Sequence, residues 1–221
     1  MKKITVARAF YLPPATGFRQ SLDDEFAILR QMKISAEVIS PVEIDPALTK
    51  MARGLANPLG EIAYWKRYVE IVENVILSGI DVQTPIFIVG FNLGGSLAAY
   101  SATTISVSGL IIAGSIPRLT EFWANSEHPV AASARAAAAA SALPNYCEKL
   151  RPYDLTSSLN GITIPVLLQF GNQDEWIDRS QVDELESLAS SSMMIKWYED
   201  GHDMAMNHCF HDRCQFLAQH I

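Results

Sequence analysis

The sequence has few cysteines and little positive charge. Only three of its 221 residues are cysteines, Cys147, Cys209 and Cys214. An odd number at this spacing does not make a disulfide framework, so we expect reduced thiols and a cytoplasmic protein. Lys and Arg number 17 against 24 Asp and Glu, for a net charge of −7, and they cluster only at Lys2 and Lys3. This balance argues against a nucleic-acid or anionic-membrane partner.

Long apolar runs are missing too. Residues 85–102 and 105–116 are interrupted by glycines and polar residues, and neither gives a clean span of about 18 residues. The first residues resemble a signal peptide, but Arg8 breaks the apolar stretch, and we interpret it as a strand. We therefore expect no membrane segment, no metal and no cofactor, and a small-molecule substrate as the partner. The oligomeric state stays open, a homodimer included.

Strand and helix patterns alternate along the chain. A length of 221 residues with 49% apolar content can build one full core, and we expect a single domain. The apolar patterns predict strands over residues 4–12, 36–42, 86–89, 107–112, 163–170 and 194–198, and helices over residues 21–33, 61–78, 131–143, 179–190 and 207–219. Such alternation predicts an α/β fold, with a mostly parallel sheet covered by helices on both faces.

About fifty residues separate the strand at 107–112 from the strand at 163–170. This is too long for a simple crossover, so we expect a lid or cap insert at about residues 117–160. Its alanine-rich part, 131–143, favours a slim helix. Two interpretations stay open: a solvent-facing surface helix, or a lid whose Phe122 and Trp123 contact a ligand.

The segment Gly90-Phe-Asn-Leu-Gly-Gly95 lies between a strand and a helix. Glycines two before and two after Asn92 let strand and helix approach closely and present the central side chain at the edge of the sheet. Farther along the chain, Asp174 and His202 each follow a predicted strand. The chain thus has an elbow residue, an acid and a histidine, in that order.

These features resemble the α/β-hydrolase superfamily, most closely its small dienelactone-hydrolase and carboxylesterase members, whose elbows look like G-F-[SC]-x-G-G. The resemblance covers most of the chain. It implies a three-layer fold that starts at the family's third strand, with about six strands and the first ones missing. It also implies that Asp174 is the acid of a catalytic triad and His202 the base, with Asp178 as the alternative acid. We expect Glu199 and Asp200, just before His202, to be solvated.

The resemblance also implies an oxyanion hole. Its first donor is the backbone N–H of Leu93, and Leu12 or Ala15 supplies the second, because Pro13 and Pro14 between them have no N–H. We add Phe91, Trp123 and Trp176 to the substrate-binding residues, Trp176 because it lies two residues after Asp174.

The chain departs from the family at Asn92, where the family has Ser, Cys or Asp. An amide is not a usable nucleophile, and loss of the nucleophile alone costs about 10⁶-fold in turnover in subtilisin. We expect the other nucleophilic side chains near the elbow or in the insert, Ser96, Ser115 and Cys147, to be structural.

Several interpretations of Asn92 remain. In the first, His202, oriented by Asp174, is the general base of a lyase, cyclase or hydration reaction, and Asn92 binds substrate or water. In the second, Asn92 replaces the nucleophile of a serine carboxylesterase or thioesterase. In the third, the chain is a non-catalytic pseudo-hydrolase that binds a small ligand. In the fourth, Asn92 deamidates to a carboxylate nucleophile, a reaction that Leu93 after it slows.

Overall fold

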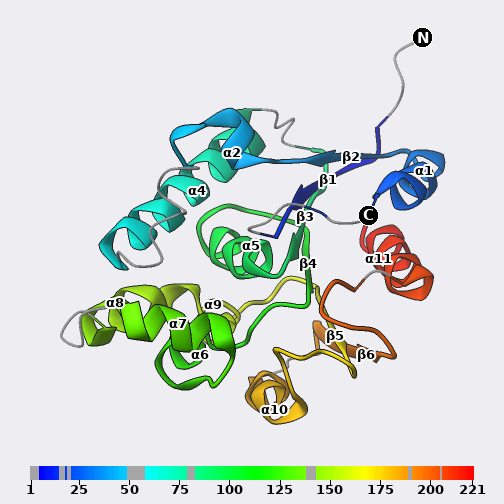
Figure 1. The fold of residues 1–221 in the computed structure, drawn as a ribbon. Coiled ribbons are helices and arrows are strands. Elements are labelled where there is room, and N and C mark those ends of the chain that lie inside the picture. Colours follow the sequence, from blue (N-terminus) through cyan, green and yellow to red (C-terminus); the bar gives the residue numbers. More distant parts are fainter. Residues whose placement is uncertain are drawn as a thin grey trace.

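The computed structural model describes residues 5–14, 18, 21–48, 58–78, 83–137, 143–188, 191–204 and 206–221. The six strands are β1 (Ala7–Leu12), β2 (Ile34–Val38), β3 (Ile86–Phe91), β4 (Gly109–Ala113), β5 (Val166–Gly171) and β6 (Met193–Tyr198). They form one sheet in the order β2-β1-β3-β4-β5-β6, and every neighbouring pair is parallel. The predicted parallel α/β sheet of about six strands is thus confirmed (Figure 1).

Helices follow most of the strands. The described helices outside residues 117–160 are α1 (Asp23–Gln31), α2 (Pro41–Ile44), α4 (Pro58–Ser78), α5 (Leu93–Thr104), α10 (Arg179–Leu188) and α11 (Asn207–Gln219). We call residues 117–160 the insert. Its described helices are α6 (Leu119–Asn125), α7 (Pro129–Ala137), α8 (Leu143–Leu150), the 3₁₀ turn η1 (Arg151–Tyr153) and α9 (Leu155–Ser158).

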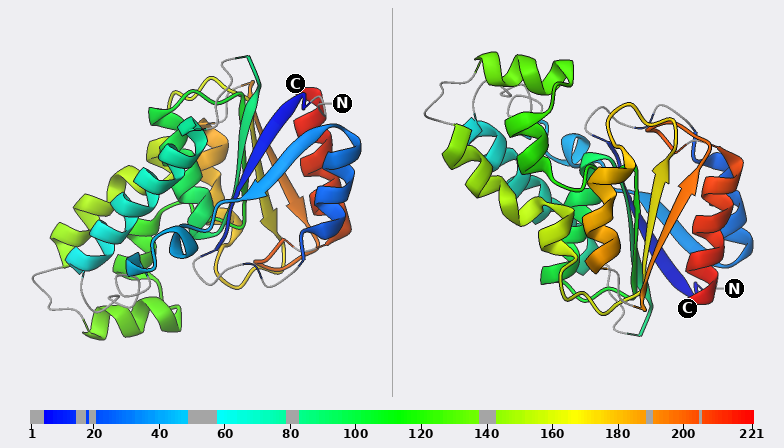
Figure 2. Two further views of the ribbon diagram at one scale, coloured as in Figure 1. Left: turned by 90° about the horizontal axis from the view of Figure 1, so that it is seen from above. Right: turned by 90° about the horizontal axis from the view of Figure 1, so that it is seen from below.

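The sheet separates two apolar clusters. Successive side chains of a strand point to opposite faces, so Phe10 and Leu12 of β1 lie in one cluster and Ala9 and Tyr11 in the other. The larger cluster includes side chains of α4, α5, α10 and the insert, and the smaller one includes side chains of α1 and α11. Figure 2 shows this arrangement, with α1 and α11 on one side of the sheet and the other helices opposite.

The sequence predicts most elements within a few residues, but three details differ. The first helix begins at Asp23, two residues after the predicted start, with Leu22 at its N-cap, and the Ser21 hydroxyl accepts from the backbone N–H of Asp23. The second strand ends at Val38, because Pro41 begins the short helix α2. The alanine-rich segment contributes α7, which ends at Ala137, and residues 138–142 lie outside the described residues.

None of the helices in the described part of the chain combines the length and apolarity that a bilayer crossing requires.

The parallel direction of the strands has a consequence for function. Because all strands run the same way, the carboxyl ends of β3, β5 and β6 meet at one edge of the sheet. In open parallel sheets, ligands bind outside this edge.

Candidate active site

The turn after β3 has the geometry of a nucleophile elbow. Asn92 has φ 50° and ψ −120°, a left-handed conformation that few non-glycine residues adopt. The turn is also tightly packed, since a Cβ atom at Gly90 would overlap the carbonyl oxygen of Gly94, and one at Gly94 would overlap the carbonyl oxygen of Leu12. Both sites therefore need glycine, and the strained turn presents the Asn92 side chain at the start of α5.

The side chain of Asn92 makes two hydrogen bonds at once. Its oxygen Oδ1 accepts from the backbone N–H of Leu93, with N and Oδ1 2.5 Å apart. Its nitrogen Nδ2 contacts Nε2 of His202. The first bond fixes the orientation of the amide, since only the oxygen can accept from an N–H, and the NH₂ group must then face the imidazole.

His202 joins the elbow to the acid. Its Nδ1 lies 2.8 Å from Oδ2 of Asp174. The Asp174 side chain is fully shielded from solvent, and that of His202 is 15% exposed. A carboxylate accepts only, so Nδ1 carries the proton and Nε2 of the neutral imidazole is free to accept from Asn92. The structure thus brings Asn92, His202 and Asp174 together in one chain of contacts.

Asp174 also holds its own loop in place. Its second oxygen, Oδ1, accepts from the backbone N–H groups of Trp176 and Ile177, at 2.7 and 3.1 Å. The alternative acid, Asp178, lies at the start of α10, where its Oδ1 accepts from the hydroxyl of Ser180. These contacts place Asp174, rather than Asp178, against the histidine.

Trp176 packs against two imidazole rings. It stacks on His202 with ring centroids 5.3 Å apart, and it packs at a tilt against His128 of the insert with centroids 3.9 Å apart. Phe122 of α6 continues the stack at 5.9 Å from Trp176. The insert therefore contacts the loop that carries the acid. Sequence reasoning missed His128, because a lone histidine before a proline carries no signal of its own.

A groove of ≈ 520 Å³ lies where these segments meet. Its lining residues come from the insert, from the loop after β5 and from α10, and they are Ser126, Glu127, His128, Pro129, Asp174, Glu175, Trp176, Ile177, Asp178 and Gln181. A volume of this size suits a small-molecule ligand. Trp176 lines this groove, whereas Asn92 and His202 are not among its lining residues, so a binding role for Trp176 stays a prediction.

The other predicted binding residues have packing contacts. Phe91 is 3% exposed and lies in the smaller cluster, where its ring packs against Phe18 and Tyr11. Trp123 packs edge-to-face on Phe122. Leu12 is buried at the end of β1, and Ala15 lies outside the described residues. Binding roles for Leu12, Phe91 and Trp123 stay predictions.

The nucleophilic side chains at other positions are structural where the contacts are given. The Ser115 hydroxyl donates to the backbone carbonyl of Asn92 at 2.5 Å, so it links the elbow to the chain just after β4. Ser96 is buried in α5. Cys147 lies 3.7 Å from the carbonyl oxygen of Thr120, and burial raises the pKa of its thiol.

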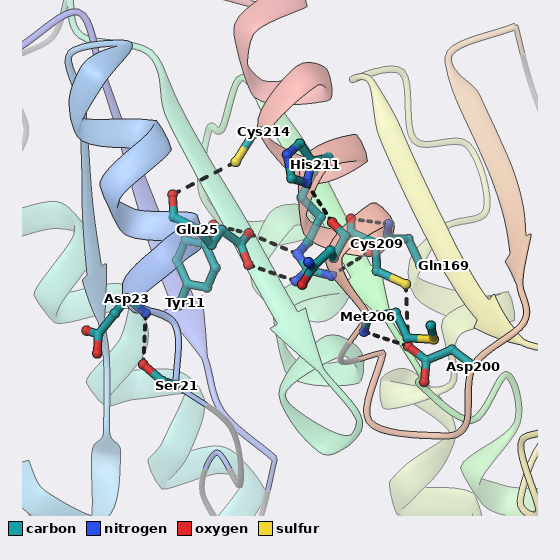
Figure 3. A network of polar contacts seen from close by, with 12 residues as sticks. Tyr11, Ser21, Asp23, Glu25, Gln169, Asp200, Met206, Cys209, His211 and Cys214 are labelled. Atoms are coloured by element: carbon teal, nitrogen blue, oxygen red, sulfur yellow. Dashed lines mark hydrogen bonds and ion pairs between the residues drawn. The ribbon is translucent and has the colours of Figure 1, made fainter.

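A buried polar network supports the elbow strand from the other face of the sheet. Arg213 of α11 forms a two-pronged ion pair with Glu25 of α1, at 2.9 and 2.7 Å, and both side chains are 2% exposed. The Tyr11 hydroxyl also donates to Glu25, and the Arg213 guanidinium lies 5.0 Å from the ring centre of Phe91. Figure 3 shows Glu25 and Tyr11 at one end of this network and Gln169 of β5 near its middle.

No family model and no curated protein sequence matches the chain. Solved structures do. The acetyl xylan esterase from Paenibacillus sp. R4 superposes with a TM-score of 0.72 at 14% identity, over 98% of this chain and 75% of that one. Est1E from Butyrivibrio proteoclasticus gives a TM-score of 0.64 at 12% identity, over 97% and 86%. Acetyl Xylan Esterase 1 from Thermoanaerobacterium sp. JW/SL YS485 gives 0.63 at 14% identity, over 99% and 76%.

The chain has the α/β-hydrolase fold. Structures of esterases confirm, at the level of the fold, the resemblance drawn from the elbow, the acid and the histidine. At identities of 12–14% they do not indicate the substrate of this chain. In this fold, Asn92, Asp174 and His202 follow one another along the chain, and the amide of Asn92 faces the histidine.

Proposed function

We propose that this chain is an enzyme that acts on a small carbonyl, ester or thioester substrate, with His202 as its general base. The observation that carries the proposal is the position of His202, between the buried carboxylate of Asp174 and the elbow residue Asn92. A carboxylate that accepts from Nδ1–H orients the ring and stabilises the imidazolium that forms when Nε2 takes a proton.

Asn92 makes an acyl-enzyme unavailable and sets the type of reaction. With no hydroxyl at the elbow, Nε2 of His202 takes its proton from water or from the substrate itself. The chemistry is therefore hydration, direct hydrolysis, elimination or cyclisation, and no covalent intermediate forms on residue 92.

The same amide can bind the substrate oxygen. The backbone N–H of Leu93, the expected oxyanion donor, is engaged by Oδ1 of Asn92. A carboxamide nitrogen has two hydrogens, and only one of them points to Nε2, so the second can donate to a substrate carbonyl. The ≈ 520 Å³ groove beside Asp174 and Trp176 offers room for the rest of a small molecule.

A test is turnover of a panel of small esters and thioesters, with p-nitrophenyl acetate first, by the wild type, His202→Gln and Asn92→Ala. The proposal expects turnover without a burst, lost in His202→Gln and only reduced in Asn92→Ala. Equal rates in the wild type and His202→Gln would exclude His202 as the base.

A second candidate is a pseudo-hydrolase that binds a small ligand without turning it over. One observation favours it: the side-chain amide of Asn92 is hydrogen-bonded both to Nε2 of His202 and to the backbone N–H of Leu93. This candidate expects a panel compound that raises the melting temperature and yields no product. For either function, three free cysteines favour a reducing cytoplasmic location.

A further inference from the structure

Asp200 lies two residues before His202 and contacts the chain on both sides of it. Its Oδ1 accepts from the backbone N–H of Gly201 at 2.8 Å, and its Oδ2 accepts from the backbone N–H of Met206 at 2.9 Å. The sequence predicts a solvated Asp200. In the structure the residue is half-buried, and its two oxygens accept from residues before and after the histidine.

The same residue ties the histidine loop to the acid loop. Its backbone carbonyl accepts from the N–H of Gln173 at 3.0 Å, one residue before Asp174. A second bond of this kind runs from the N–H of Asn172 to the carbonyl of Tyr198, at 2.7 Å. The two loops that bring together Asp174 and His202 are therefore linked through Asp200.

Asp200 is also joined to the buried framework of the smaller cluster. Its Oδ2 lies 3.5 Å from Sγ of Cys209, a fully buried residue of α11. The carbonyl of Cys209 accepts from Nε2 of Gln169 at 2.9 Å, and Oε1 of Gln169 accepts from Arg213 at 3.0 Å. Figure 3 shows this path from Gln169 through Cys209 to Asp200 and Met206. The histidine loop is therefore held against a buried part of the molecule.

We propose that Asp200 is a positioning residue, whose carboxylate holds the loop so that the His202 imidazole reaches Asp174 on one side and Asn92 on the other. The inference rests on the proposed function in taking His202 as the base. It adds a residue that acts through His202 and not on the substrate. The Met206 bond fixes the chain after His202, where the side chain of Met204 is also fully buried in the smaller cluster.

Two variants weaken the contacts of the Asp200 carboxylate from opposite sides. Asp200→Asn keeps one acceptor oxygen but places an NH₂ group against one of the two N–H donors. Met206→Pro deletes the donor and leaves Asp200 intact. Met206 has φ −70° and is the N-cap of α11, so its backbone already has the φ that a proline requires. Because it is not buried, its side chain contributes little to stability.

Matched controls separate the hydrogen bond from other effects. Met206→Ala removes the same side chain but keeps the N–H. Glu199→Gln removes a negative charge from the neighbouring residue and keeps an oxygen for the side-chain amide of Asn172, which donates to Glu199 at 2.6 Å. Neither control touches the bond between Asp200 and Met206.

The readout is the downfield proton resonance of His202 Nδ1–H, identified by its absence in His202→Gln. It needs no substrate, so it tests this inference even if the native protein turns nothing over. We expect Asp200→Asn and Met206→Pro to speed solvent exchange of this proton about ten-fold or more, since a bond to a charged acceptor is lost. The two controls should exchange at the wild-type rate, and backbone resonances of β5 and α5 should stay in place in every variant.

The proposal is overturned if both Asp200→Asn and Met206→Pro exchange this proton at the wild-type rate, or if the wild type shows no such resonance. If Asp200→Asn does not fold, Met206→Pro decides, because it changes nothing at Asp200. Met206→Ala behaving like Met206→Pro would also contradict the proposal, since the side chain would then matter and not the N–H.

Discussion

The side-chain nitrogen of Asn92 faces Nε2 of His202, the atom that takes the proton in hydrolases of this fold. The histidine is held from the far side by Asp174. In the proposed function, the acid and the base are in place, and the site differs from that of a serine hydrolase at the elbow, where Asn92 has no hydroxyl to attack a substrate.

Asn92→Ser should convert the site to one that reacts covalently. A hydroxyl at this position would lie beside a histidine that is already oriented and would free the Leu93 N–H to bind an oxyanion. We expect the variant to react with a fluorophosphonate probe and to hydrolyse p-nitrophenyl acetate with a burst, whereas the wild type does not react with the probe. Intact-mass spectrometry measures the labelling.

The control is the same substitution combined with His202→Gln, which should abolish labelling. An Asn92→Ser protein that stays inert would show that the site differs from a serine hydrolase in more than this residue.

Trp176→Ala should reduce His202-dependent turnover by about ten-fold or more. Without the indole, the His202 imidazole can move and spends less time in the geometry that the reaction requires. The indole packs against His202 and His128, so its removal leaves both rings without their neighbour. Trp176→Phe keeps a ring and should retain most activity. Steady-state kinetics should place the loss in kcat more than in KM; an unchanged kcat in Trp176→Ala would contradict this role.

The fold could be predicted because short sequence patterns and the order of the elements determine it. Residues 86–89 are an unbroken apolar run, and Gly90 and Gly94 mark the turn that follows it. The order of the elbow, Asp174 and His202 then places three side chains at one edge of a parallel sheet. All of this depends on residues close together in sequence, or on the order of elements.

The rest depends on contacts that no local pattern encodes. The contact of His128 with Trp176 depends on the path of the insert through space. Asp200 has the sequence features of an ordinary polar loop residue, and only the structure shows that it accepts a hydrogen bond from the backbone N–H of Met206. Phe91 lies next to the elbow in sequence, yet alternation along β3 turns its ring into the smaller cluster, away from Asn92.

Arg213→Met should destabilise the fold by about 3–5 kcal/mol, since it leaves the carboxylate of Glu25 buried without its cation. Combining it with Glu25→Gln should restore part of the loss, because no buried charge then remains. Urea unfolding followed by circular dichroism measures both. A loss below about 1 kcal/mol in Arg213→Met would mean that the pair contributes as little as a surface ion pair.

Alkylation should distinguish the three thiols. Burial, together with nearby carboxylates, raises the pKa of Cys209 to about 12 and that of Cys214 to about 12. Both should therefore stay unmodified by iodoacetamide at pH 8 in the folded protein, while the half-buried Cys147 reacts slowly and faster as the pH rises. Peptide mapping after native and urea-denatured labelling gives the rates. Equal modification of Cys209 under both conditions would contradict its burial.

The measurement that tests the central claim most directly is the ¹⁵N NMR spectrum of the His202 imidazole in its neutral form. The account predicts a protonated Nδ1, bonded to Asp174, and an unprotonated Nε2 that accepts from the side-chain amide of Asn92. A neutral ring with its proton on Nε2 would contradict it, because that nitrogen could then neither accept from Asn92 nor take a proton from a substrate.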